Sequence, residues 1–258
     1  MKFLTSLFVL SVVSTSALSA KDTRAPDLDL AIRYYSKVLT AEGVTREARY
    51  EEKMLRRTGH VWVARVVPKA VDAKALHAAP EIAKKNVSLK VKEPEHQHFN
   101  HVLTSRHIIL DNNKLRVEYV DAHSKNIVSV PASEYANVNF DGSWENSFYL
   151  LDPKLVNAMP VSPKSSAVPD AQWHEREKNG VFQRVLWDTQ KQIPLIIESG
   201  DKAATFYQRV DVTPQASTTS ALPWKNLQGY AQKEYADFLD WIDFVEAGRL
   251  GLSGQSMG

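Results

Sequence analysis

The chain has 258 residues, of which 43% are hydrophobic, so it can build the core of one sandwich- or barrel-sized domain or of two small ones. The 32 Lys and Arg residues nearly balance the 30 Asp and Glu residues, and these charges are interspersed, which gives no argument for a nucleic-acid partner. There is no cysteine, which excludes structural disulfides, thiol catalysis and thiolate metal sites.

The first twenty residues have the three parts of a secretory signal peptide. Lys2 supplies a positive charge, Phe3–Val13 an apolar core and Ser14–Ala20 a run of small residues. The candidate cleavage positions follow Ala17, Ser19 and Ala20. The apolar core is shorter than the ~20 residues that span a bilayer, and no later segment is apolar for long enough. We therefore expect a soluble mature chain without a transmembrane segment, exported most simply to a bacterial periplasm.

The N-terminal part of the mature chain predicts three strands. The front of Pro26–Leu39 is predicted as a short helix, and its back, from Arg33, as a strand. Val44–Arg57 is rich in helix-forming residues, but it lies between a glycine turn and an evident strand, so we interpret it as a long, partly exposed strand. His60–Val67 is the next strand, and Pro68 ends it.

In the middle of the chain a stretch without predicted strands is followed by three more strands. Lys69–Ser105 begins with a predicted helix at Val71–Lys85, which Pro80 interrupts, and continues as a polar, histidine-dense stretch. Three short strands joined by polar turns follow, at Arg106–Leu110, Leu115–Asp121 and Asn126–Val130. Tyr135–Trp144 is predicted to pair at a sheet edge, and Phe148–Met159 to form a short helical or irregular excursion.

The clearest strand pattern lies between residues 172 and 212. The predicted strands are Gln172–Glu177, Val181–Trp187, Ile193–Glu198 and Ala203–Val212. In the last of these, apolar residues alternate with polar ones, which is typical of a half-buried strand. Gln215–Leu222 follows as a small-residue linker, Gln228–Ala247 as an amphipathic helix docked on the sheet, and Gly248–Gly258 as a frayed tail.

This arrangement resembles the outer-membrane lipoprotein carriers, the LolA-like proteins, and the related RseB-type periplasmic regulators. YYSKVLTAEGVTREARYEEKMLRRTGHVWVARV looks like the opening hairpins of that family, HIILDNNKLRVEYVDAHSKNIVSV like its central hairpins and RVLWDTQKQIPLIIESGDKAATFYQRVDVTP like its closing hairpins. The resemblance covers roughly Arg33 to Pro214, with a gap at Lys69–Ser105. It is a pattern of strands and turns, and Thr58 stands where the family usually has proline.

The resemblance implies a mainly β fold with some α structure. A strongly curved antiparallel sheet, an open half-barrel, would be covered by short helices and a C-terminal helix, with an apolar concave face that holds acyl chains or another lipophilic ligand. The implied organisation is a signal peptide at 1–20, a half-barrel at 21–214 with a His-rich insertion at 69–105, and a linker, helix and tail at 215–258. By parity and size, the expected cavity-lining residues are Trp62, Tyr119, Trp187 and Phe206. Alternatively, these four side chains fill an ordinary closed core.

The one concentration of potential chemistry is EPEHQHFNH at residues 93–101. In an extended segment His96 and His98 point the same way, and a turn could bring His101 round. Three neutral imidazoles with Glu95 beside them would suit copper or zinc. The alternatives are a solvated loop and a pH-responsive patch.

Three functions follow from these patterns. The first is an exported carrier-like protein, related to outer-membrane biogenesis, that holds a lipophilic ligand or a hydrophobic segment of a partner. The second is a metal-binding accessory protein that uses His96, His98 and His101, and the third is an envelope regulatory adaptor. No phosphate-binding glycine loop, Rossmann fingerprint or hydrolase elbow is found in the sequence, so nothing argues for an enzyme.

Overall fold

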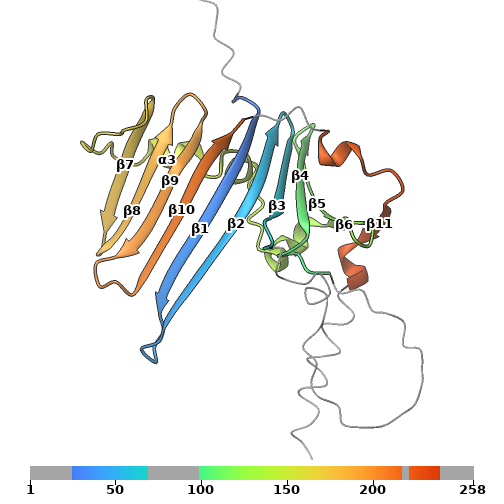
Figure 1. Cartoon of the computed structure of the whole chain (residues 1–258), viewed down its shortest axis with the longest axis horizontal. Helices are drawn as coiled ribbons and strands as arrows, with labels where there is room; N and C mark the ends of the chain where they lie inside the picture. The colour runs from blue at the N-terminus through green and yellow to red at the C-terminus, as the bar shows by residue number, and fades with distance from the viewer. Residues whose placement is uncertain (1–24, 69–98, 217–220, 239–258) are drawn as a thin grey trace, which may run out of the picture.

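In the computed structural model the described residues are 25–68, 99–216 and 221–238. They form one large, open, curved sheet with a few short helices, as the sequence predicted (Figure 1). None of the helices in these ranges is long and apolar enough to cross a membrane. The predicted signal peptide, the helix at Val71–Lys85 and the tail at Gly248–Gly258 lie outside the described residues.

Eleven strands of the described residues make up the sheet. In chain order they are β1 (Leu28–Leu39), β2 (Thr45–Arg57), β3 (His60–Arg65), β4 (Ser105–Asp111), β5 (Lys114–Asp121), β6 (Asn126–Val130), β7 (Ala171–Lys178), β8 (Val181–Asp188), β9 (Ile193–Asp201), β10 (Phe206–Gln215) and β11 (Ala231–Glu234). The predicted strand at Val44–Arg57 is confirmed, as are the two predicted meanders, to within a few residues at their ends.

The strand order across the sheet is β11-β6-β5-β4-β3-β2-β1-β10-β9-β8-β7. Most sequence neighbours pair antiparallel, but β6 does not pair with β7, nor β10 with β11. Two other pairings are non-local. β1 pairs with β10 along almost its whole length, from Asp29–Gln215 to Val38–Phe206. β11 pairs with β6 in parallel and is the edge strand on that side of the sheet. The first strand of the described chain is therefore central, and Figure 1 shows its hairpin with β2 projecting beyond the neighbouring strands.

The two faces of the sheet differ in composition. One face, here called the core face, carries the side chains that point to the same side as Leu30, Met54, Val61, Ile108 and Val117. These five residues are at most 2% exposed. Short helices and loops cover this face: η1 (Ala132–Val138), α2 (Trp144–Tyr149) and α3 (Pro153–Asn157). The middle of the core face is thus filled by side chains from the segment between β6 and β7.

Among the described residues, the other face, here called the opposite face, is covered only at one end. Trp224, Leu227 and Tyr230 of the segment before β11 pack there on strand residues of β3, β5 and β6, namely Trp62, Val120 and Ile127. Residues Pro223–Lys225 of this segment form a short 3-10 helix, η2. The C-terminal segment therefore lies across one half of the opposite face before it adds β11 to the edge.

A buried arginine ties three parts of the fold together. Arg56 of β2 points into the core face with no exposed surface. Its Nε and Nη2 donate to the carbonyl oxygen of Pro26 at 3.1 and 2.9 Å, and Nη2 also donates to that of Lys191 at 2.7 Å. Nη1 donates to the carbonyl oxygens of Phe148 and Gln192 at 3.4 and 3.3 Å. Backbone carbonyls alone satisfy this cation, which shows that its role is structural.

Three local predictions were wrong. The front of Pro26–Leu39 is not a helix, because Leu28 already belongs to β1 and the alternating Leu30 and Ile32 fill the core. Tyr135–Trp144 does not pair at an edge but contains the end of the 3-10 helix η1 and a loop.

The amphipathic helix predicted at Gln228–Ala247 is also contradicted in its described part. Ala231–Glu234 form the strand β11, and Tyr235–Phe238 form a single 3-10 turn, η3. Hydrogen bonds to the open edge of β6 override the helix propensity of these residues. Tyr235 and Phe238 reach the core cluster with the i, i+3 spacing of a 3-10 turn. Residues 239–247 lie outside the described residues.

Candidate functional site

A large hollow lies beside the central strands, where β3 has ended. Within the described residues, β3 pairs with β2 only from Glu52 to Arg57, and the outer edge of β2 before Glu51 has no strand partner. The backbone N–H of Val66 donates to the carbonyl of Glu51, which holds the segment after β3 against this edge. The hollow here has a volume of about 1030 Å³. It lies at the margin of the packed core.

The walls of the hollow combine apolar surface with charge. Its apolar and aromatic members are Tyr34, Tyr35, Tyr50, Val66, Val67, Pro68 and Leu103. Its charged members are Arg33, Arg49, Glu51, Arg65, Arg209 and Asp211. Tyr34 and Tyr50 are cross-strand partners whose rings stack with centroids 4.4 Å apart. This pair forms an aromatic platform between β1 and β2.

Exposed apolar side chains concentrate near this hollow. Ten large hydrophobic residues of the described chain are exposed, and six of them lie on the β1–β2 hairpin or beside the hollow: Val38, Leu39, Val44, Tyr50, Val66 and Val102. Exposed apolar residues scattered singly need no explanation, so the ones that count here are Tyr50 and Val66, which line the hollow itself.

A second, smaller cavity adjoins the hollow. It has a volume of about 230 Å³ and shares Tyr34, Tyr50 and Arg65 with the larger one. Its other polar members are Glu52, His101, Thr104, Arg106, Tyr119 and Asn139. We call this smaller cavity the inner pocket. The strand register assembles it on the core face, because Glu52 is paired with Arg65 across β2 and β3, and Arg106 with Tyr119 across β4 and β5.

The ionised side chains of the inner pocket sum to a net positive charge. Burial raises the pKa of Tyr34, with the nearby Glu52 adding to the effect, so this phenol stays neutral. Burial, together with the charge of Arg106, lowers the pKa of His101, so the imidazole is also neutral at pH 7. The two guanidinium groups of Arg65 and Arg106 are then opposed by the carboxylate of Glu52. Oε1 of Glu52 lies 3.8 Å from Nη1 of Arg65, which is beyond hydrogen-bonding distance.

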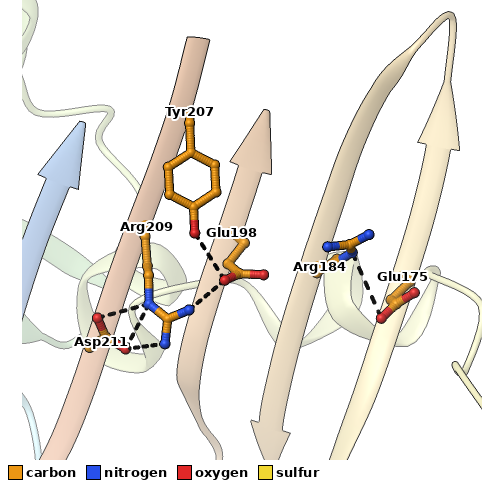
Figure 2. A network of polar contacts seen from close by, with 6 residues as sticks. All are labelled: Glu175, Arg184, Glu198, Tyr207, Arg209 and Asp211. Carbon is orange, nitrogen blue, oxygen red and sulfur yellow. Dashed lines mark hydrogen bonds and ion pairs between the residues drawn. The ribbon is translucent and has the colours of Figure 1, made fainter. Parts of the chain in front are cut away.

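Charged side chains on β9 and β10 of the opposite face, by contrast, form a hydrogen-bonded network with one another. Figure 2 shows Arg209 of β10 between Asp211 and Glu198, with Tyr207 pointing at the same glutamate. Nη2 of Arg209 donates to Asp211 at 2.7 Å, Nη1 pairs with Glu198, and the Tyr207 hydroxyl donates to Glu198 at 3.0 Å. The hydrogen bond to Asp211 raises the pKa of Arg209. Arg209 therefore closes one side of the hollow as part of a satisfied network.

The four residues predicted to line a cavity do not come together. Trp62 lies on the opposite face under Trp224, whereas Tyr119, Trp187 and Phe206 have core-face parity. Trp187 is buried in a separate cluster with Val156 of α3. Among the described residues, Tyr119 lines the inner pocket, and the other three line neither the inner pocket nor the larger hollow.

The predicted histidine site lies only partly within the described residues. His96 and His98 lie outside them, and His101 lies in the inner pocket, where its Nε2 is 3.4 Å from Nδ2 of Asn139. Among residues 25–68, 99–216 and 221–238, no group of three or more His, Asp or Glu side chains is placed to hold a metal ion. Binding of copper or zinc by His96, His98 and His101 stays a prediction.

Sequence reasoning did not find the residues that form the hollow. Arg65 and Arg106 lie far apart in the chain, and only the β3–β4 register brings them to one place. Tyr34 and Tyr50 did carry a signal, since these two aromatic residues stand at equivalent distances from the glycine turn of one hairpin.

No protein-family model matches the chain, and no curated protein matches it either. Solved structures with a similar arrangement include PNGF-II, at 9% identity and a TM-score of 0.36. The match covers 83% of this chain but 33% of the PNGF-II chain, so this chain spans about a third of that protein's length. A domain described as an outer membrane lipoprotein-sorting protein, from Vibrio parahaemolyticus, is similar over 78% of this chain and 89% of its own, at 11% identity and a TM-score of 0.28. A DUF1329 family protein from Desulfovibrio piger is similar over 76% of this chain and 88% of its own, at 8% identity and a TM-score of 0.29.

Proposed function

We propose that this chain is an exported binding protein that holds a lipophilic ligand in the hollow beside β1 and β2. The observation that carries the proposal is the hollow itself, which combines a stacked tyrosine pair with the aliphatic surface of Val66, Val67, Pro68 and Leu103. Its volume of about 1030 Å³ is at the upper end of the ~300–1,000 Å³ typical of ligand sites. The predicted signal peptide supports export to a periplasm.

The position of the hollow supports binding and release without unfolding. The middle of the core face is filled by Phe140, Phe148 and other buried side chains, so a ligand there would have to displace packed residues at a cost of several kcal/mol. The hollow, however, lies where the sheet edge is open and the apolar side chains are exposed. A ligand that enters here gains apolar contacts while the core stays intact.

The test uses an uncharged probe, so that charge plays no part. We would titrate the protein with N-phenyl-1-naphthylamine, whose fluorescence rises in apolar surroundings, and compare Val66→Asp and Leu103→Asp with the parent. Each substitution places a carboxylate against the ligand, and we expect the affinity to fall at least about tenfold. The matched control is Val168→Asp, which changes a valine of similar exposure, 40% against 37%, in a loop away from the hollow. Equal affinities in all four proteins would refute the proposal.

A further inference from the structure

Two arginines in the inner pocket present donors that the described protein does not satisfy. Nη1 of Arg65 and Nε of Arg106 are both buried and have no hydrogen-bond partner among the described residues. Such donors are rare in proteins, because leaving a charged donor unpaired costs more than about 1–3 kcal/mol. Three other arginines of the sheet do have partners: Arg56 has backbone carbonyls, Arg57 of β2 has Asp29 at 2.6 Å, and Arg209 has Asp211 and Glu198.

The neighbours of these two arginines hold them in place without neutralising them. The guanidinium carbon of Arg65 lies 3.6 Å from the centre of the Tyr50 ring, a stacked position that leaves its edge N–H groups free to donate. Arg106 is the cross-strand partner of Tyr119, and its guanidinium carbon is 5.9 Å from the Phe140 ring. Aromatic rings on these flanks exclude water, so an anion would be bound more strongly than at the surface.

We propose that the inner pocket binds the anionic head group, a carboxylate or a phosphate, of an amphiphile whose apolar tail occupies the larger hollow. The inference rests on the proposed function, because it assigns the polar end of the same lipophilic ligand. Arg65 lines both cavities and marks the point where head and tail join. With Glu52 opposing one of the two guanidinium groups, one positive charge is left for the ligand to balance.

The sizes of the two cavities agree with this division. The inner pocket, at about 230 Å³, has room for a head group and is lined mainly by polar residues. The larger hollow has room for an alkyl chain and carries the aliphatic residues. Thr104 and Asn139 at the inner pocket add a hydroxyl and an amide that can donate to oxygen atoms of either head group.

The experiment compares three twelve-carbon probes by calorimetric titration of the full chain: dodecanoate, dodecyl phosphate and dodecanol. We expect both anions to bind at least about tenfold more tightly than dodecanol, since a charged hydrogen bond contributes about 1.5–3 kcal/mol. In Arg65→Gln and Arg106→Gln the ratio of anion to alcohol affinity should fall towards one, and Arg106→Lys should keep part of it. Whichever anion binds more tightly identifies the head group, and either result supports the inference.

The control variant is Arg184→Gln, which removes an arginine of the opposite face that pairs with Glu175 and lines neither cavity (Figure 2). It should keep the full ratio. A ratio near one in the parent, or one that survives both glutamine variants, would overturn the head-group assignment and leave the hydrophobic site standing. If no probe binds, including N-phenyl-1-naphthylamine, the proposed function fails together with the inference. Unfolding midpoints of the variants separate lost binding from lost folding.

Discussion

Nδ1 of His60 lies 3.0 Å from Nε2 of His107 on the opposite face of the sheet. The two imidazoles stack with centroids 5.2 Å apart, and the Trp224 ring stacks on both at the same distance. Only one of the two nitrogens can carry the proton of this hydrogen bond, so the two rings cannot both be protonated while it is kept. Nδ1 of His107 is buried without a hydrogen-bond partner among the described residues, and the Glu118 carboxylate is 3.8 Å from it.

We predict that the protein loses stability between pH 6.5 and pH 4. Burial, His60 and Arg116 lower the pKa of His107 from 6.5 to about 4, and burial lowers that of His60 as well. The unfolded chain therefore takes up protons at a higher pH than the folded chain does. The contribution of His107 is fully present above pH 6.5 and is lost as the pH falls towards 4, by up to about 3 kcal/mol.

Urea unfolding at about pH 7.5 and about pH 5 measures this loss. His107→Gln keeps a side chain that can hydrogen-bond His60 but does not titrate, so its stability should depend less on pH. His123→Gln changes an exposed histidine in the β5–β6 turn and should behave as the parent does. A parent-like pH dependence in His107→Gln would contradict this account.

Replacing Arg56 should destabilise the whole fold. Arg56→Met keeps most of the side-chain volume but leaves the carbonyls of Pro26, Lys191, Gln192 and Phe148 without this donor. We expect a loss of about 3 kcal/mol in the free energy of unfolding, measured with urea. Arg56→Lys should recover little, because an ammonium has three donors and no planar fork. Arg46→Met, on the exposed end of β2, serves as the control and should change stability by less than about 0.5 kcal/mol.

Removing the Trp224 ring should loosen the edge of the sheet before it affects the centre. Trp224 packs on Trp62, His60 and His107, and it lies only a few residues before β11 in the chain. In Trp224→Ala we expect the amides of β11 to lose hydrogen-exchange protection at least about tenfold, while those of β1 change little. The exposed neighbour Lys225→Ala should leave both sets unchanged. Equal loss of protection in β1 and β11 would show that the segment is not a separate unit.

Gly200 of β9 has no room for a side chain. A Cβ atom there would lie 2.8 Å from Cζ of Phe182 and 3.1 Å from the carbonyl oxygen of Phe206. Gly200→Ala should therefore cost about 1–3 kcal/mol, seen as a lower unfolding midpoint. The double variant with Phe182→Leu should recover part of this loss, because the ring atom in contact is gone. Ser199→Ala, one residue earlier and on the other face, should be nearly neutral.

The alternation of apolar residues predicted most strands correctly. Val44–Arg57 was interpreted as a strand against its helix propensity, and the structure agrees because Tyr50 and Met54 face the core side with a period of two. The same pattern could not show that Arg56 is buried, since its carbonyl partners come from three distant segments. The period-two signal was also present at Leu28, Leu30 and Ile32, but the acidic residues beside them favoured a helix.

The site was less predictable than the fold, because it depends on pairings between distant strands. Tyr119 was selected by its size and parity and does line the inner pocket. Trp62 was chosen by the same argument but faces the other side of the sheet, since the parity of one strand says nothing about the face of the next. Arg65 and Arg106 carry no comparable signal, because a sequence shows charge but not which guanidinium N–H groups lack an acceptor.

The central place of β1 affects the order in which the molecule can be completed. This strand emerges first during synthesis, but one of its two neighbours, β10, begins only at Phe206. Until then this edge of β1, from Asp29 to Val38, lacks the strand that pairs with it among the described residues, and a second copy could pair with it. Pairing between strands so far apart in the chain predicts folding on a timescale of roughly milliseconds to seconds, with β10 adding to β1 late.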